Sequence, residues 1–381
     1  MRDAPDLSLF WYLSNLPIIP NLGRNYHFFF GQGRDCPYSF IMNSHLPMPR
    51  IIDPSSVTTY RWGIIGAGGI AEHFVNGVQK HSGQQIVAVA SRTAGKAQAF
   101  AKNFGIDSHD NYEVLVSRED IDVIYIATLP SQHREHALMA IAAGKHVLIE
   151  KPIALDSKEA SDIFAAAKSA GVLAMEAMWT RYLPQYDIIR QLLDQKAFGE
   201  IEMVNVSMCQ SNLWMTRMFT KNGGDPLFDM GIYAISFCQS FLGNPISITA
   251  QAVLNAEGID EEVSVQMRYA NGGRAYVLVS GRSGIPAIGQ VSGTKAKMSV
   301  GPEFCIPSRI EFSAQEFYAP VSSWTDQTGV VGHEGLAYQT TAFASFLDSG
   351  LDESPLESHA DSIANLEVCE EIIRLVGATI R

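Results

Sequence analysis

Three side chains capable of acid–base chemistry fall in two segments of this 381-residue chain. Lys151 directly follows an apolar run, and Asp229 and Tyr233 lie four positions apart in a second segment. If that second segment is helical, the carboxylate and the phenol share one helix face. A tyrosine acts as a general base when a nearby cation lowers its pKa, and Lys151 is the candidate cation. The spacing by itself fits equally well a packed tyrosine with an ordinary polar aspartate beside it.

A glycine-rich turn joins an apolar run at Arg61–Ile65 to a helical pattern. The turn reads Gly66-Ala67-Gly68-Gly69-Ile70-Ala71, which is the dinucleotide-binding fingerprint in the strand–turn–helix context that it requires. Gly66 permits the tight turn, Gly68 lets the backbone approach a pyrophosphate, and Ala71 keeps the helix close to the strand. The amides at the helix start, including Gly69 and Ile70, would then face the phosphates. The alternative is a glycine-rich turn that binds no ligand.

The residues after the second expected strand, Ile86–Ala90, indicate which dinucleotide is bound. An NAD site usually has an acidic residue about 20 positions past the glycines, where it binds the ribose 2′-hydroxyl. This chain has Ser91 and Arg92 there, Lys96 one helical turn later, and no Asp or Glu from position 73 to position 106. A guanidinium binds a 2′-phosphate with paired hydrogen bonds, whereas a carboxylate would repel it. We therefore predict NADP in preference to NAD; the alternative is that Arg92 only stacks on the adenine.

Glu150 and Lys151 follow the expected strand His146–Ile149 at its carboxyl end. The carboxyl ends of the strands line the ligand crevice of a doubly wound sheet, so Lys151 should face the cofactor. The alternative is a lysine at a strand end that faces water. His133, six residues after the strand expected at Asp122–Ala127, is a candidate for contact with the nicotinamide ribose or is simply a histidine at a helix start.

A third cluster, with Trp179 and Arg181, lies where the pattern of elements changes. Boundaries between domains host ligand clefts as well as ordinary packing contacts. Trp179 and Arg181 are therefore candidates for the wall of a substrate cleft, or for packing between two domains.

The elements from Tyr60 onward alternate between strand and helix, which is typical of a parallel sheet wound on both faces. The expected strands are Arg61–Ile65, Ile86–Ala90, Asp122–Ala127, His146–Ile149 and Val172–Glu176. The expected helices are Ala71–His81, Ala94–Phe104, Tyr112–Val116, His133–Ala143 and Ser157–Ala170.

After about residue 183, strands follow one another with few helices between them, which predicts one large open antiparallel sheet with helices on one face. The expected strands are Ile201–Met208, Ile246–Leu254, Glu262–Tyr269, Arg274–Ser280, Ala287–Ser292, Ala296–Val300 and Ser308–Glu316. The expected helices are Pro184–Gln195, Tyr233–Leu242, Ala337–Leu347 and Ala360–Val376. Asn271-Gly272-Gly273 and Ser292-Gly293-Thr294 indicate hairpin turns.

Length and texture suggest a leader at residues 1–59, irregular or disordered, a Rossmann domain at 60–182 and a substrate and oligomerisation domain at 183–381. The leader is rich in proline and aromatic residues without periodicity. Its apolar stretch Leu7–Pro20 lacks the basic flank of a signal peptide, so secretion is disfavoured. A leader that is disordered, loosely docked or reaching onto a partner subunit remains open.

The bulk properties exclude several classes of function. The net charge of −12 argues against nucleic acid as a partner, because phosphate contacts require a basic face. No run of 18 apolar residues is present, so no membrane span is expected. The five cysteines are scattered without a CxxC pair, which indicates free thiols in a reducing compartment, a cytoplasmic location and no metal site.

Taken together and in order, these motifs resemble the glucose–fructose oxidoreductase / inositol dehydrogenase family over residues 60 to about 376. The motifs are Gly66-x-Gly68-x-x-Ala71, Thr128-Leu129-Pro130 with His133, Glu150-Lys151-Pro152, and Gly223-Gly224 through Asp229-x-Gly231-x-Tyr233. The most similar subgroup is that of dihydrodiol dehydrogenases and NADP-dependent D-xylose dehydrogenases. Many members have His in place of Tyr233, which makes an inositol-type substrate less expected.

The resemblance implies a role for each matching residue. Tyr233 would be the general acid/base, Lys151 would bind the substrate hydroxyl and lower the tyrosine pKa, and Asp229 would orient the substrate. Trp179 and Arg181 would wall the substrate pocket. Thr128, Leu129, Pro130, His133 and Glu150 would lie on the cofactor side, and the peptide before Pro152 would be cis.

The resemblance also implies an activity and an assembly. We expect an NADP-dependent enzyme that oxidises the C1 hydroxyl of an aldose to a lactone, with D-xylose the leading substrate, and that forms a homodimer through its open sheet. One alternative is oxidation of a trans-dihydrodiol by the same residues. Another is a regulator that binds the dinucleotide without turnover, which the presence of both Lys151 and Tyr233 disfavours.

Overall fold

The computed structural model describes residues 46–221 and 224–379. The described residues all belong to one compact unit. Gly223 of the predicted glycine pair, Cys36 and most of the predicted leader lie outside them.

The first sheet contains six parallel strands in the order β3-β2-β1-β4-β5-β6. The strands are β1 (Arg61–Ile65), β2 (Gln85–Ala90), β3 (Asp107–His109), β4 (Val123–Ile126), β5 (His146–Ile149) and β6 (Ala174–Glu176). The accompanying helices are α2 (Gly69–His81), α3 (Lys96–Phe104), α4 (Tyr112–Val116), α5 (Pro130–Ala142) and α6 (Ser157–Ala170). This is the doubly wound sheet that the sequence predicted, with one added strand.

The added strand, β3, was not predicted because it has no apolar pattern. It is only three residues long, reads Asp-Ser-His, and pairs at the sheet edge with β2 alone. The central strand β4 contrasts with it, because all four of its side chains are buried. A parallel strand covered on both faces gives a continuous apolar signal, and an edge strand need not.

Helix starts follow local capping signals. Asn111 accepts the Val114 amide at the start of α4, and Asp156 accepts the Glu159 amide at the start of α6, each through its side chain. Such caps bind amides that have no partner inside the helix. They explain why the helix starts at residues 112 and 157 match the predictions.

An aromatic cluster ties a C-terminal helix to the first sheet. Trp62 of β1 lies 5.9 Å from Phe74 of α2 and 5.1 Å from Phe343 of α9 (Leu336–Asp348), measured between ring centroids. Phe74 stacks in turn on Tyr125 of β4 at 3.8 Å. The chain therefore returns to the first sheet after it has completed the second sheet.

The second sheet has eight strands in the order β14-β13-β12-β11-β7-β10-β9-β8. The strands are β7 (Ile201–Cys209), β8 (Ser247–Leu254), β9 (Asp260–Arg268), β10 (Arg274–Ser280), β11 (Ile285–Gly293), β12 (Ala296–Val300), β13 (Arg309–Ala314) and β14 (Ser322–Thr325). All neighbours are antiparallel except β7 and β10, so the predicted antiparallel sheet needs that one correction. Both predicted hairpin turns are present, between β9 and β10 and between β11 and β12.

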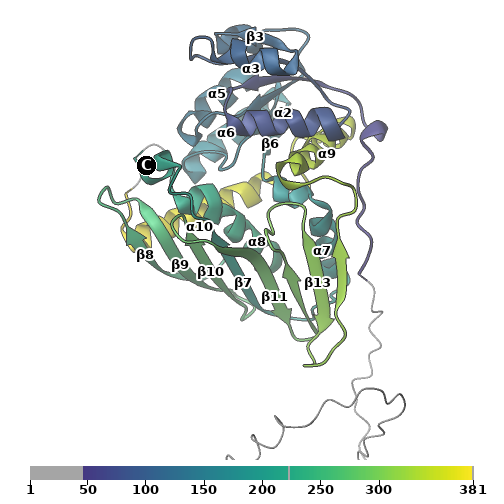
Figure 1. The fold of residues 1–381 in the computed structure, drawn as a ribbon, viewed down its shortest axis with the longest axis vertical. Coiled ribbons are helices and arrows are strands. Elements are labelled where there is room, and N and C mark those ends of the chain that lie inside the picture. The colour runs from purple at the N-terminus through teal and green to yellow at the C-terminus, as the bar shows by residue number, and fades with distance from the viewer. Residues whose placement is uncertain (1–45, 222–223, 380–381) are drawn as a thin grey trace, which may run out of the picture. The chain divides into compact units, whose positions relative to one another are not determined.

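Helices cover one face of the second sheet, as Figure 1 shows for α8 (Ile232–Leu242) and α10 (His359–Val376). Gly289 of β11 leaves room for Phe237 of α8, because a Cβ there would lie 2.6 Å from the ring. On β10, Ala275 and Val277 are buried on the covered face. Tyr276 is exposed on the opposite face. This alternation is the pattern expected of a sheet that is packed on one side only.

Four 3₁₀ turns and one π-helix complete the described structure. The 3₁₀ turns are η1 (Pro54–Ser56), η2 (Trp179–Tyr182), η3 (Thr216–Phe219) and η5 (Gly332–Gly335), and the π-helix is η4 (Leu227–Gly231). Residues 46–59, the described end of the predicted leader, are irregular apart from η1. They are nevertheless docked, because Arg50 forms a two-pronged ion pair with Asp187 of α7 (Pro184–Asp194). No helix among the described residues has the length and apolarity needed to span a bilayer.

Candidate active site

The glycine-rich turn has the geometry that a bound dinucleotide needs. Gly66 has a φ of +104°, and a Cβ there would lie 2.7 Å from the Ala127 carbonyl oxygen, so only glycine fits. A Cβ on Gly68 or Gly69 would meet no protein atom within 4 Å. No side chain caps the start of α2, and Ala71 is fully buried against the sheet. The helix start thus has space and free amide donors that would suit a diphosphate.

Arg92 and Lys96 are the two cations that the sequence predicts to contact the 2′-phosphate of NADP. Arg92, exposed in the loop after β2, lies with its guanidinium carbon 5.3 Å from the centre of the Tyr112 ring. Lys96 is exposed at the first position of α3. Neither forms an ion pair with another described residue, so both charges are available to a ligand. Ser91 before them is buried, and its amide binds the His109 carbonyl of β3.

His133 does not face the crevice. It is fully buried, and its two ring nitrogens lie 3.1 Å from the Thr128 carbonyl oxygen and 3.0 Å from the Pro152 carbonyl oxygen. Burial lowers the pKa of His133 to about 4, so the imidazole is neutral. The structure therefore gives this residue a different task from the predicted ribose contact, since it joins the loop after β4 to the loop after β5.

The remaining residues of that motif lie at the start of α5. The hydroxyl of Thr128 is 3.0 Å from His136 Nδ1. Leu129 precedes the helix and is partly exposed, and Pro130 is its first residue. A proline at the first position of a helix loses no hydrogen bond, because that amide has no partner in the helix.

Lys151 lies at the centre of the predicted acid–base cluster. Its Nζ donates to the carboxylate Oδ1 of Asp229 at 2.8 Å and to the Asp229 carbonyl at 2.6 Å. The same nitrogen lies 5.0 Å from the centre of the Tyr233 ring. Burial opposes the ammonium charge, but the charges of Asp229 and Tyr233 outweigh it and raise the pKa of Lys151. The side chain is therefore a fixed cation, and only 12% of it is exposed.

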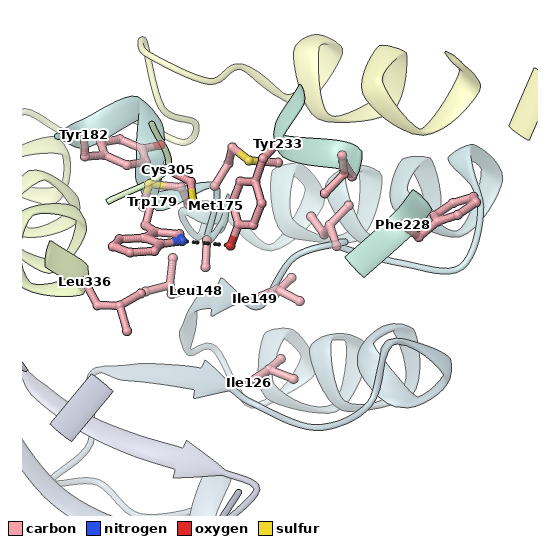
Figure 2. Packing of buried hydrophobic residues seen from close by; sticks show 14 of the residues in the cluster. Ile126, Leu148, Ile149, Met175, Trp179, Tyr182, Phe228, Tyr233, Cys305 and Leu336 are labelled. Atoms are coloured by element: carbon pink, nitrogen blue, oxygen red, sulfur yellow. Dashed lines mark hydrogen bonds between the residues drawn. The ribbon is translucent and has the colours of Figure 1, made fainter. Parts of the chain in front are cut away.

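Tyr233 is bound at its hydroxyl by Trp179. Trp179 Nε1 donates to the phenol oxygen at 2.8 Å, a bond that Figure 2 shows among the apolar side chains of Leu148, Ile149 and Met175. Burial raises the pKa of Tyr233 and the charge of Lys151 lowers it. The effect of Lys151 has the direction that the sequence predicted, but burial has the larger effect, so the net pKa of Tyr233 is raised. In this structure the phenol is protonated near neutral pH.

The π-helix η4 brings Asp229 and Tyr233 to the same lysine. Asp225 accepts the Phe228 amide at 2.9 Å, and Asp260 of β9 accepts the Leu227 amide at 3.0 Å, each through a side-chain oxygen. Gly231 allows close packing on β10, because a Cβ there would lie 2.9 Å from Val279. Single π-turns within helices occur frequently at functional sites. Regular helical spacing, the basis of the sequence prediction, is thus not the geometry that the chain uses here.

Buried carboxylates hold the backbone next to Lys151. Glu150 accepts the Tyr125 hydroxyl and, at 3.3 Å, the Lys151 amide. Glu176 at the end of β6 accepts the Ile153 amide at 3.0 Å. Burial raises the pKa of Glu150 and of Glu176 to about 7. The Lys151–Pro152 peptide between these contacts is cis, as expected from the resemblance.

Arg181 is directed into the protein interior. Its guanidinium forms an ion pair with the buried Glu357 and donates to the hydroxyls of Ser236 and Ser240 on α8. Only 11% of the side chain is exposed. The predicted substrate contact finds no support in this arrangement, and the predicted alternative of packing between the two halves agrees with it.

Sequence reasoning missed His333 of η5 and His73 of α2. The His333 ring stacks on Trp179 at 5.7 Å and on His73 at 4.4 Å, measured between ring centroids. Neither histidine belongs to a motif, and no local spacing relates them. Only the return of the chain to α2 brings them together.

Two family models match the chain. The model described as the oxidoreductase family with an NAD-binding Rossmann fold matches residues 60–178, and the GFO/IDH/MocA C-terminal domain matches residues 186–299. The chain belongs to the GFO/IDH/MocA oxidoreductase family. It is an oxidoreductase of the dehydrogenase type that acts on CH–OH donors.

Curated relatives extend over almost the whole described chain. Trans-1,2-dihydrobenzene-1,2-diol dehydrogenase of Xenopus tropicalis is 31% identical over 84% of this chain and 98% of that protein. The enzymes of the same name from Danio rerio and Homo sapiens are 32% and 28% identical, over 83% and 84% of this chain and 97% of each relative.

Solved structures confirm the fold. A 3-ketoreductase from Actinomadura kijaniata, KijD10, solved with NADP and TDP-benzene, has a TM-score of 0.72 at 23% identity, covering 84% of this chain and 98% of that one. An aldose-aldose oxidoreductase from Caulobacter crescentus has a TM-score of 0.72 at 20% identity, with the same coverage.

Proposed function

We propose that this protein is an NADP-dependent dehydrogenase that oxidises one hydroxyl of a trans-vicinal diol on a six-membered ring. The observation that carries the proposal is the convergence of Lys151, Asp229 and Tyr233 at the carboxyl end of β5. A trans-dihydrodiol is the favoured substrate, because curated relatives that are about 30% identical to this chain are named as dehydrogenases of such a diol. D-xylose in its pyranose form carries adjacent ring hydroxyls of the same kind and is the second candidate, with a lactone as product.

Tyr233 is the proposed proton acceptor in this reaction. The substrate hydroxyl has to replace Trp179 as the neighbour of the phenol oxygen, or share that oxygen with it. The phenol must lose its own proton before it accepts another, because burial raises its pKa. In the reverse reaction, the reduction of a carbonyl, the protonated phenol of Tyr233 already carries the proton that it would donate.

Lys151 and Asp229 are the proposed polar partners of the diol. The ammonium of Lys151 opposes the raised pKa of the phenol and offers a donor to the reacting oxygen. The Asp229 carboxylate is 33% exposed, so it is accessible to a second hydroxyl on the ring. An aspartate beside a fixed cation suits a neighbouring hydroxyl donor, because charge-assisted hydrogen bonds are the stronger ones.

The residues at the start of α2 fit a dinucleotide, and the cations after β2 fit a 2′-phosphate. Gly66 and Gly68 leave room for the diphosphate, and Arg92 and Lys96 would bind the extra phosphate of NADP. The bound dinucleotide supplies the hydride acceptor, and the protein supplies orientation and charge.

A homodimer is the proposed assembly, with the open face of the second sheet as the contact. Met203 and Tyr276 are exposed on neighbouring strands of that face, 42% and 37% respectively. Large exposed apolar side chains on a sheet face are typical of association surfaces. Cytoplasmic location stays a prediction from the use of cysteine.

The test is a turnover assay that follows reduced nicotinamide by its absorbance. Purified protein is given NADP⁺ or NAD⁺ with trans-1,2-dihydrobenzene-1,2-diol, D-xylose or inositol. Reduction of NADP⁺ with the dihydrodiol, faster than with inositol, is the expected result. Binding of NADP without turnover of any of these substrates would contradict the proposal and favour the non-catalytic regulator.

A further inference from the structure

His333 is the middle ring of a stack that ends at the candidate active site. Its plane is 17° from that of Trp179 on one side and 13° from that of His73 on the other. Trp179 in turn donates to the hydroxyl of Tyr233. The Trp179 indole therefore lies in this series of contacts between His333 and Tyr233, the proposed proton acceptor.

The backbone that carries His333 is held firmly to α2. Glu334, the next residue, binds Lys80 at 2.6 Å and His81 at 2.9 Å. Gly77 of α2 lets this turn approach closely, because a Cβ there would lie 3.1 Å from the Glu334 carbonyl oxygen. The position of the imidazole is thus set by packing and by the contacts of Lys80 and His81 with the neighbouring Glu334.

A recess lies on the outer side of the stack. It has a volume of about 580 Å³ and is lined by His73 and His333 together with Asn76, Lys80 and Glu334. Trp179 does not line it. His333 is therefore shared between the recess and the stack, and its ring stands between the open recess and the Trp179–Tyr233 pair.

We propose that His333 is a specificity-determining residue, a wall behind the Trp179 indole that separates the indole from the recess along α2. With the imidazole in place, the indole is held beside Tyr233 and the site takes a substrate of a single ring. Without it, the indole can turn into the recess, so that the site widens and admits a second fused ring. This inference rests on the proposed function in placing the diol at Tyr233.

The first experiment compares a small and a large substrate. The ratio of kcat/KM for the trans-dihydrodiol of naphthalene to that of benzene is measured in the parent, His333→Ala, His333→Leu and His333→Phe. His333→Ala should raise the ratio about tenfold, since removing bulk from a pocket wall changes selectivity by 10-fold or more. His333→Leu should raise the ratio less, and His333→Phe should leave it near the parental value.

His81→Ala is the matched control. It removes a contact between the same two elements, at Glu334, but His81 does not line the recess. It should leave the ratio unchanged. A ratio that stays parental in His333→Ala and in His333→Leu, or that rises equally in His81→Ala, overturns the proposal.

The second experiment needs no turnover. Acrylamide quenching of Trp179 fluorescence is isolated from the other four of the five tryptophans by subtracting the signal of the same variant with Trp179→Phe. Quenching should rise severalfold in His333→Ala and stay low in His333→Phe, because Trp179 is only 4% exposed behind the imidazole. Equal quenching in all variants overturns the proposal for His333, even if the parent protein shows no turnover. Parental inactivity with the expected quenching refutes the proposed function alone.

Discussion

The cofactor side and the acid–base side of the candidate site are built in opposite ways. On the cofactor side, the start of α2 is open, and the exposed side chains of Arg92 and Lys96 form no ion pair with a described residue, although Arg92 lies over the Tyr112 ring. On the acid–base side, Lys151 and Tyr233 are buried and bound to Asp229 and Trp179. A ligand on the first side meets unused donors, whereas a substrate on the second has to compete with bonds that already exist.

Because of this difference, we expect the cofactor side to govern binding affinity and the acid–base side to govern proton transfer. Exposed cations bind phosphate through charge, with little rearrangement of the protein. Buried groups that hold one another have shifted pKa values, and these shifts govern proton transfer. Substitutions on the two sides should therefore change different measured quantities.

The largest effect is expected from Tyr233→Phe. Removing the proton acceptor should lower kcat by about 10²- to 10⁴-fold, the usual contribution of general acid–base catalysis, with NADP affinity unchanged. Turnover and NADP titration by fluorescence measure the two quantities. Tyr182→Phe is the control, because it removes another buried hydroxyl, bound to Ser354, away from Lys151. Loss of NADP binding in Tyr233→Phe would show that the two sides are not separable.

Arg92→Asp tests the other side. NADP affinity should fall by about 10- to 100-fold, corresponding to the loss of charge-assisted hydrogen bonds, while NAD affinity changes little. Lys102→Asp, in the last turn of helix α3, which follows the loop of Arg92, makes the same change of charge farther along the chain. Equal weakening of NADP and NAD, measured by titration, would show that Arg92 does not read the 2′-phosphate.

The pH dependence of oxidation follows from the state of Tyr233. The acceptor must be deprotonated, and its pKa is raised by burial, so the reactive form is a minor one near neutral pH. kcat/KM for oxidation should therefore increase by up to about tenfold per pH unit through neutral and mildly alkaline pH. The profile is recorded at saturating NADP⁺. A rate that is flat over this range would mean that another group limits proton transfer.

The smallest effect is expected outside both regions, at the described end of the leader. Removing residues 1–55 deletes Arg50 and leaves Asp187 without its ion-pair partner. Arg50 is 65% exposed, so we expect a loss of about 1 kcal/mol in unfolding free energy after screening by solvent, with the protein still folded and active. Removing residues 1–45 should have no such effect, because it keeps this pair. Thermal melting of the two truncations compares them.

The difference in stability between the two truncations should depend on pH, because it comes from the ion pair of Arg50 and Asp187. The pKa of Asp187 is lowered despite its burial, because Arg50 and Gln191 bind the carboxylate. Its contribution is therefore present above the usual aspartate pKa and is lost as the pH falls through the lowered value. The melting temperatures of the two truncations should converge in acid; a gap that persists there would mean that the stability comes from packing of residues 46–55.

Local motifs made the cofactor side predictable. Gly66 is required by its positive φ, and Arg92 follows β2 at a fixed place in the chain. The helix starts at Asn111 and Asp156 were predictable for the same reason, because each capping side chain lies only three residues before the amide that it binds. The edge strands β3 and β14 were missed, since they are only three and four residues long and contain almost no apolar side chains.

Distant contacts made the acid–base side only partly predictable. The sequence singled out Lys151, Asp229 and Tyr233 as candidates, but not that a π-helix carries Asp229 and precedes the helix of Tyr233, or that Trp179 binds the phenol. It assigned His133 and Arg181 to ligands, whereas both bind protein groups. A polar side chain shows its chemistry in the sequence, but its partner is chosen by the packing around it.

The sequence by itself determined the doubly wound sheet, the glycine-rich turn and the candidate acid–base residues, because these depend on periodicity, backbone conformation and spacing within short segments. Only the tertiary structure decided which of these groups are buried, which hold one another, and that His333 stacks against Trp179. Burial and pairing set pKa values and access, and they arise from elements that the chain brings together after hundreds of residues. Motifs therefore indicate the reaction class, and packing decides how the site is closed and what it admits.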